Sequence, residues 1–194
     1  MDIIFSLVDE HYGYVFEFEK TIATTVALMP ESFLNCIFEC TEEQQQRRQL
    51  FIRRGGLRTY PLAKINTTVL IEWCHARNDP SVWPAISGAV TLWSKNGEQS
   101  VLTLDEAAIE LLEASPEPLA VLESFAERIT PSSWTGSLAN IMQARSNAIS
   151  MLSKHERTDI AEAAKVVGEK MIQWVERQKE REQREDSERE QRFE

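Results

Sequence analysis

The chain has 194 residues, 42% of them hydrophobic, which is enough to build one domain with a substantial core. Its 31 acidic and 21 basic side chains give a net charge of −10, which argues against a general binder of nucleic acids or membrane surfaces, because such binders need clustered positive charge. No apolar run approaches the roughly 18 to 20 residues that span a bilayer, and the first residues lack the basic start and apolar core of a signal peptide.

The N-terminal region predicts helices. From Ile3 to Met29, apolar residues recur at close to the period of a helix, and Gly13 divides the segment into a short and a long piece. The alternation over 14–18 also fits a short strand, so that alternative stays open. Pro30 stands at a position typical of a helix start, and the apolar stripe of the next helix ends at Cys40.

A polar stretch and a glycine pair follow. The segment 41–49 carries no apolar residue, which fits either a solvated helical extension or a surface loop. Gly55 and Gly56 are a strong stop signal. Arg53 and Arg54, directly before them, are the cations that the dipole of a helix favours at its carbonyl end.

The rest of the chain predicts three helical hairpins, because three helix-start signals each close one amphipathic helix and open another. The signals are spaced about 36 to 40 residues apart, near the range of helical repeats. They are Asp79-Pro80-Ser81-Val82, Ser115-Pro116-Glu117-Pro118 and His155-Glu156-Arg157-Thr158-Asp159. The predicted hairpins cover residues 62–96, 103–130 and 136–175.

In the first hairpin, Asn66 or Thr67 caps a helix that ends near Asn78. The partner helix has Pro84 in its first turn, where the missing N–H does no harm, and its apolar stripe continues to Asn96. These two helices form the clearest antiparallel pair in the sequence.

In the second hairpin, Thr103 or Asp105 caps the first helix. The third hairpin begins at about Ser137 and turns at 155–158. Its second helix continues beyond the end of its apolar stripe at Trp174.

The tail 176–194 has Phe193 as its only hydrophobic residue. Opposite charges stand four residues apart with the acid first, which is the favourable order on a helix. These pairs are Glu180/Arg184, Glu185/Arg189 and Glu188/Arg192. The tail fits a solvated helix without further role, and it equally fits a spacer or an electrostatic contact surface.

These elements predict an all-α fold of stacked antiparallel helical hairpins with a long charged C-terminal helix. The single helical-repeat domain covers residues 1–175, with the N-terminal helices in 1–60. The charged helical tail covers 176–194.

Asp79-Pro80-Ser81-Val82-Trp83 resembles the Asp-Pro start of the inner helix in HEAT/armadillo-type repeats, over about residues 62 to 175. The segment Ser132-Ser133-Trp134-Thr135-Gly136-Ser137, with the hairpin and charged tail after it, resembles the C-terminal region of large bacterial helical-repeat proteins. The resemblance implies a HEAT-like solenoid that is a terminal section, or a stand-alone relative, of a larger scaffold such as those of multidomain NTPase-type defence or signalling proteins. It carries no residue over to an active site.

Basic residues gather around the Gly-Gly turn of this acidic chain, and they are Arg47, Arg48, Arg53, Arg54, Arg58 and Lys64. Such a patch suits a phosphate, a nucleic-acid backbone or an acidic partner. A helix end recruits arginine in any case, and the glycine pair lacks the spacing and the following Lys-Ser/Thr of a phosphate loop. Nucleic acid is therefore not the expected partner.

No spacing in the chain announces a metal, a cofactor or a catalytic site. Adjacent ligand types, such as Cys74 and His75, point about 100° apart on a helix and do not converge on one ion. Cys36 and Cys40 share a helix face, where buried cysteines are usually small core residues. The odd cysteine count suits reduced thiols, so we expect a cytoplasmic protein without enzyme activity, cofactor or metal.

Trp134 is the remaining candidate site residue, in a Ser/Thr/Gly-rich segment between hairpins. It suits an exposed anchor for a partner, although its large apolar surface favours a plug between adjacent repeats. We expect a non-catalytic protein–protein interaction scaffold that binds a protein partner or itself, and no membrane. One alternative is a nucleic-acid or anion sensor that uses the patch from Arg47 to Lys64, and another is an oligomerisation or assembly segment.

Overall fold

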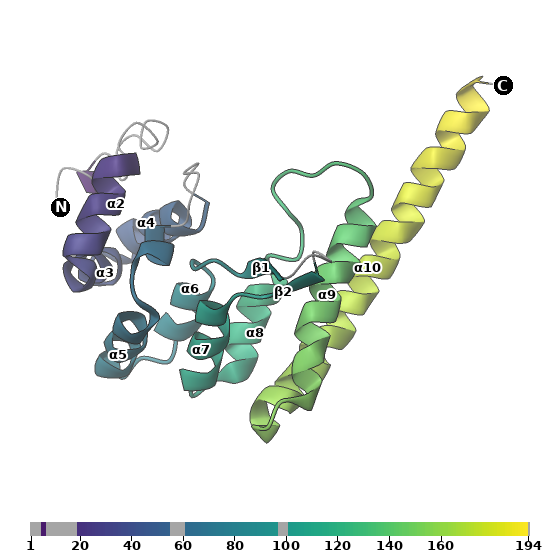
Figure 1. Ribbon diagram of the computed structural model, residues 1–194. Helices are drawn as coiled ribbons and strands as arrows, with labels where there is room; N and C mark the ends of the chain where they lie inside the picture. Colours follow the sequence, from purple (N-terminus) through teal and green to yellow (C-terminus); the bar gives the residue numbers. More distant parts are fainter. Residues whose placement is uncertain (1–4, 7–18, 55–60, 97–100, 194) are drawn as a thin grey trace. The chain divides into compact units, whose positions relative to one another are not determined.

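The computed structural model describes residues 5–6, 19–54, 61–96 and 101–193, and most of these residues are helical (Figure 1). This helical content confirms the expected all-α class. The helix expected before Glu19, the strand alternative at 14–18 and the Gly55-Gly56 turn lie outside the described residues.

The chain divides into two compact units, and each unit combines two separate stretches of sequence. Unit 1 comprises residues 1–92 and 106–116, and unit 2 comprises residues 93–105 and 117–194. The helices of the predicted second hairpin therefore fall in different units. They are α7 (Glu106–Ala114) in unit 1 and α8 (Pro118–Ala126) in unit 2.

Unit 1 is built from short helices whose ends follow local signals. Pro30 occupies the first turn of its helix, and the Asn66 side chain caps another by accepting a hydrogen bond from the Thr68 N–H at 2.8 Å. That helix ends at Asn78, whose left-handed backbone has φ 49°. Besides α7, the elements are α2 (Glu19–Leu28), α3 (Pro30–Phe38), α4 (Glu42–Arg54), the 3-10 helix η2 (Pro61–Lys64), α5 (Thr67–Arg77) and α6 (Val82–Ser87).

The core of unit 1 forms where α3 contacts α2, α4 and α5. Its side chains, almost fully buried, include Ile22, Val26, Phe33, Leu34, Ile37, Phe51, Ile52, Leu62 and Leu70. Residues 42–49 are helical, but they belong to α4, which begins at Glu42 after a break that follows α3. The polar segment is therefore neither an extension of the preceding helix nor a surface loop over most of its length. Among the described residues no single helix is both long and apolar enough to cross a membrane; α2 and α3 meet that criterion only together, across a bend of 106°.

Unit 2 is organised around its longest helix, which packs along two shorter helices. Besides α8, its elements are β1 (Trp93–Asn96), β2 (Val101–Leu104), α9 (Leu138–Ser150), the 3-10 helix η3 (Met151–Lys154) and α10 (Thr158–Phe193). The buried face of α10 repeats every three or four residues and carries Ile160, Ala164, Val167, Met171 and Val175. Figure 1 shows α10 running back along α9 and continuing past the amino-terminal end of α9, and the extension of this helix beyond its apolar stripe is as predicted.

The prediction that the partner helix of the first hairpin continues to Asn96 is wrong after Ser87. Helix α6 ends at Ser87, and β1 pairs antiparallel with β2, with Trp93 opposite Leu104 and Asn96 opposite Val101. One physical signal explains the difference, since aromatic and β-branched residues such as Trp93, Val101 and Thr103 favour strands. Thr103, one predicted helix cap, lies inside β2 instead.

Candidate partner-binding site

The segment between α8 and α9 carries Trp134 and ends in a defined helix start. Gly136 has φ 80°, a backbone conformation that side chains disfavour, so glycine suits this position. Ser137 follows as the N-cap of α9, where its Oγ accepts a hydrogen bond from the Asn140 N–H at 3.1 Å. The chain therefore enters α9 in a fixed direction directly after Trp134.

Glu182 of α10 joins this helix start to the charged part of α10. Its carboxylate accepts hydrogen bonds from Ser137 Oγ at 2.7 Å, from the Ala139 N–H at 2.9 Å and from Gln178 Nε2 at 3.2 Å. The hydrogen bond from Ser137 is the largest cause that lowers the pKa of Glu182 below its ordinary value. A carboxylate at the amino end of a helix is also favoured by the helix dipole. Glu182 therefore fixes the segment before α9 against α10.

A groove of about 500 Å3 lies between this segment and α10. Trp134, Gly136 and Ser137 line one side of it, and Glu182, Glu185 and Asp186 are among the residues on the α10 side. Trp134 is 50% exposed. This exposure favours the exposed anchor over the plug between adjacent repeats, and both readings stay predictions.

Charged side chains give the α10 wall of the groove a net negative charge. Arg181 Nε lies 2.9 Å from Glu185 Oε1, and Arg189 Nη1 lies 3.8 Å from Asp186 Oδ1. Glu182, in contrast, accepts its three hydrogen bonds from uncharged groups. The pairing also differs from the acid-first pattern predicted for the tail, since Glu185 pairs with Arg181 rather than with Arg189.

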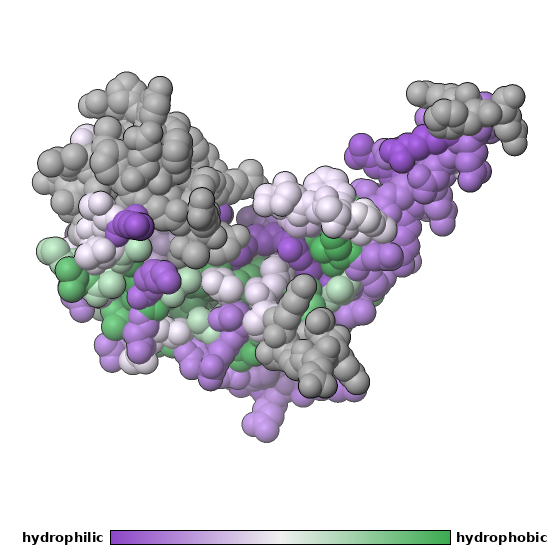
Figure 2. Space-filling view, turned by 45° about the horizontal axis from the view of Figure 1, so that its top comes forward, coloured by the Kyte–Doolittle hydropathy of each residue, from purple (hydrophilic) through white to green (hydrophobic). Residues whose placement is uncertain are grey.

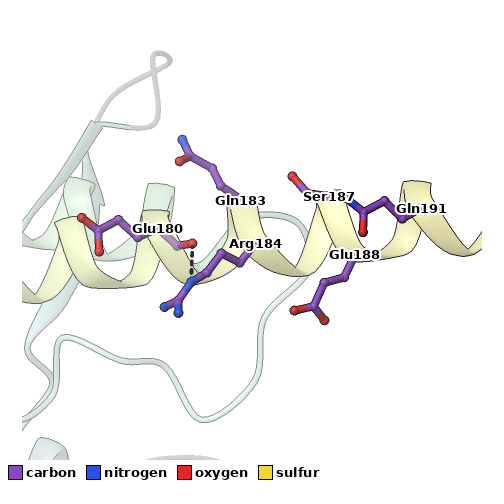
Figure 3. A pocket seen from close by; sticks show the side chains of 6 residues that line it. All are labelled: Glu180, Gln183, Arg184, Ser187, Glu188 and Gln191. Carbon is purple, nitrogen blue, oxygen red and sulfur yellow. Dashed lines mark hydrogen bonds between the residues drawn. The ribbon is translucent and has the colours of Figure 1, made fainter.

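The charged part of α10 beyond Val175 presents a hydrophilic surface in the view of Figure 2. A second hollow on it is lined by Glu180, Gln183, Arg184, Ser187, Glu188 and Gln191, and Figure 3 shows these side chains along one stretch of the helix. Arg184 Nε donates to the Glu180 backbone carbonyl at 3.4 Å. Because all of its lining residues come from α10, this hollow is open helix surface, and the Trp134 groove is the more enclosed of the two.

Three arginines of the predicted basic patch contact groups of unit 1. Arg47 pairs with Glu43 at 2.6 Å along α4. Arg48 donates to the Cys36 carbonyl at 2.6 Å, and its guanidinium carbon lies 4.8 Å from the centre of a phenylalanine ring. Arg53 donates to the Pro84 carbonyl at 3.4 Å. These contacts give the three arginines structural roles within unit 1.

The remaining members of the patch are placed only in part. Lys64 is exposed in the last turn of η2. Arg54 ends α4, and Arg58 lies outside the described residues. The structure thus does not show the six residues converging on one anion site, and the patch stays a prediction.

Within the described part of the chain, no group of three His, Cys, Asp or Glu side chains is arranged to hold a metal ion. Burial raises the pKa of the Cys74 thiol to about 12, which keeps it protonated and unreactive at neutral pH. Cys36 lies on α3 and Cys40 lies two residues beyond its end, and both are half-buried. The expectation that the two cysteines share a helix face is therefore wrong, because α3 ends at Phe38.

Compared with protein-family models, curated proteins and solved structures, the chain gives no significant match. The resemblance to HEAT/armadillo-type repeats therefore stays a prediction.

The sequence pointed to Trp134 but not to the residues that surround it. Glu182 and Asp186 belong to a run rich in Glu, Arg and Gln, in which nothing in the sequence distinguishes one acidic residue from another. The local signal was Ser137, which is a good N-cap residue. Such a cap is often completed by an acidic side chain in the first turn of the same helix, and α9 has none there. A carboxylate from a distant helix fills that role here.

Proposed function

We propose that the chain is a non-catalytic protein–protein interaction module and that the Trp134 groove is part of its binding face. The half-exposed ring of Trp134 carries the proposal. Large aromatic side chains are enriched among the residues that dominate binding energy at protein interfaces. An apolar ring surface exposed to water is unfavourable, so burying it against a partner contributes free energy to binding.

The hydrogen bonds at Glu182 support the same proposal. They hold the end of the Trp134 segment to α10, so part of the binding face is ordered before a partner arrives. Preorganisation of this kind lowers the entropy cost of binding. On this proposal the helices act as a scaffold, and the HEAT-like stacking of the predicted hairpins is part of the same proposal.

The first test compares protein capture by wild type, Trp134→Ala and Met151→Ala from a lysate of the source cells. Met151 is a matched control, because it is a large apolar residue of unit 2 that is 67% exposed and lies in η3. We expect wild type and Met151→Ala to retain the same protein at high salt, and Trp134→Ala to bind it about thirtyfold more weakly, since truncating a central aromatic anchor costs about 2 kcal/mol or more.

Equal capture by Trp134→Ala and wild type would contradict the proposal. Capture of nucleic acid at low salt only, abolished by Arg53→Glu/Arg54→Glu, would instead favour the sensor alternative, because phosphate contacts weaken steeply as salt rises. Circular dichroism of each variant checks that the helices are intact.

A further inference from the structure

The walls of the Trp134 groove differ in chemistry. One wall carries the aromatic ring of Trp134, and the other carries the carboxylates of Glu182, Glu185 and Asp186 together with two guanidinium groups. Three carboxylates against two guanidiniums leave the groove with a net charge of −1. The net charge of the whole chain, −10, has the same sign and attracts cations over longer distances.

The carboxylates of the groove are not equally neutralised. Arg181 lies close to Glu185, but the pair of Arg189 and Asp186 is open, at 3.8 Å, and both of its side chains are more than 70% exposed. Exposed pairs of this kind are weak and exchange partners easily. The charge of Glu182 is held by uncharged donors. An incoming cation therefore meets two carboxylates that are weakly neutralised. Asp186 has only the distant Arg189, and the three hydrogen bonds of Glu182 come from uncharged donors.

We infer that the Trp134 groove receives a basic side chain, lysine or arginine, of a partner protein, with the cation over the Trp134 ring and next to Asp186. Tryptophan is the aromatic side chain that binds cations most strongly through its ring face. A carboxylate beside the ring adds a charge-assisted hydrogen bond. The volume of about 500 Å3 lies within the range of sites that accept a single side chain or small ligand.

Other partner chemistries fit the groove less well. An acidic segment would meet the net negative charge of the α10 wall. A wholly apolar segment would bury the Asp186 and Glu182 carboxylates without a new partner, which costs solvation energy. A basic side chain covers the ring and neutralises the carboxylates in one contact. This inference rests on the proposed function, because it names the chemistry of the partner at the same groove.

The test uses nuclear magnetic resonance of the full chain labelled with 15N. The Trp134 indole N–H signal, assigned by its loss in Trp134→Phe, is followed during titration with four capped nonapeptides of Gly and Ser. The peptides differ only at the central residue, which is arginine, lysine, citrulline or glutamate. Citrulline has the shape of arginine without its charge. We expect the arginine and lysine peptides to shift the signal with at least about tenfold higher affinity than the other two, because only they form the cation contact.

Two charge-matched variants locate the effect. Asp186→Asn removes one carboxylate from the groove, and Glu188→Gln removes one carboxylate from the hollow shown in Figure 3. We expect Asp186→Asn to weaken binding of the arginine peptide at least about threefold and Glu188→Gln to leave it within error, since exposed charges act mainly over short distances at physiological salt. Equal effects of the two variants would show that overall charge, not the groove, attracts the peptide, and would overturn the inference.

The outcomes separate this inference from the proposed function. The inference of a basic side chain is wrong if the citrulline or glutamate peptide binds as well as the arginine peptide. It is also wrong if no peptide shifts the Trp134 signal while Trp134-dependent capture of a protein persists. In both cases the proposed interaction module stands. If Trp134→Ala also captures the same protein as wild type, both proposals fall.

Discussion

At the scale of single residues, Glu182 has the most consequential position in unit 2. It lies two turns beyond Val175, the last buried residue of α10 up to residue 191, and it bonds to Ser137 and Ala139 at the start of α9. The charged part of α10 is therefore attached to α9 through polar contacts, at Glu182 and at Lys179, whose Nζ donates to Gln143 Oε1 at 3.0 Å.

Ser137→Ala removes both the cap of α9 and the hydroxyl that donates to Glu182. We expect the free energy of unfolding to fall by about 1 kcal/mol, the usual cost of losing a helix cap. Urea unfolding at neutral pH measures this. Ser133→Ala, an exposed serine of the same segment, is the control and should change stability little.

Glu182→Gln has a pH-dependent effect whose sign follows from its lowered pKa. Because the folded-state pKa lies below the ordinary value of 4.5, the ionised carboxylate stabilises the fold above that pH, and the stabilisation is lost as the pH falls through the folded-state pKa. The stability difference between wild type and Glu182→Gln should thus be constant near neutral pH and shrink in acid. A difference that persists unchanged in acid would contradict the role given to its charge.

At the scale of elements, the two parts of α10 are stabilised by different interactions. Up to Val175 it is held by the buried side chains it places against α8 and α9. Farther along, up to residue 191, its side chains are exposed or half-buried. Ion pairs along an exposed helix contribute only about 0.2 to 0.5 kcal/mol each.

Hydrogen exchange should reveal this division. We expect amides between Ile160 and Val175 to be the most protected in α10, and those after Asp186 to exchange about tenfold faster or more, because the unsupported end opens locally. Mass spectrometry of peptic fragments measures the profile. Uniform protection to the end of the helix would mean that another surface covers it, for example in self-association.

The sequence predicts the helices of the described part well where their signals are local. Asn66, Asn78 and Ser137 mark helix ends because a cap depends on one side chain and its neighbouring backbone. The β1–β2 hairpin was missed because Leu92 and Trp93 also continue a helical apolar stripe, and only pairing with β2 decides between the two structures. The site was predicted only in Trp134, since its contact with α10 joins residues more than 40 positions apart.

At the scale of the whole molecule, each unit has its own buried core. Leu34 of α3 and Leu122 of α8 are fully buried in unit 1 and unit 2. The stretches that interrupt each unit are short, 93–105 within unit 1 and 106–116 within unit 2. Closing short loops costs little entropy, so each unit can keep its fold when the other has lost it.

We therefore expect two thermal transitions, which calorimetry resolves. Leu34→Ala should lower the temperature of one and Leu122→Ala that of the other, because replacing a buried leucine by alanine lowers the free energy of unfolding by about 2 to 5 kcal/mol. If both variants shift a single shared transition, the units unfold cooperatively and the expectation is wrong.

The interleaving of the two units along the sequence also limits how recombination can exchange them between genes. The shortest continuous segments that contain every residue of each unit are 1–116 and 93–194, and these segments overlap. Any single recombination point that leaves one unit whole therefore cuts the other. A single crossover therefore cannot exchange one unit alone, although each unit has the core of a separate domain.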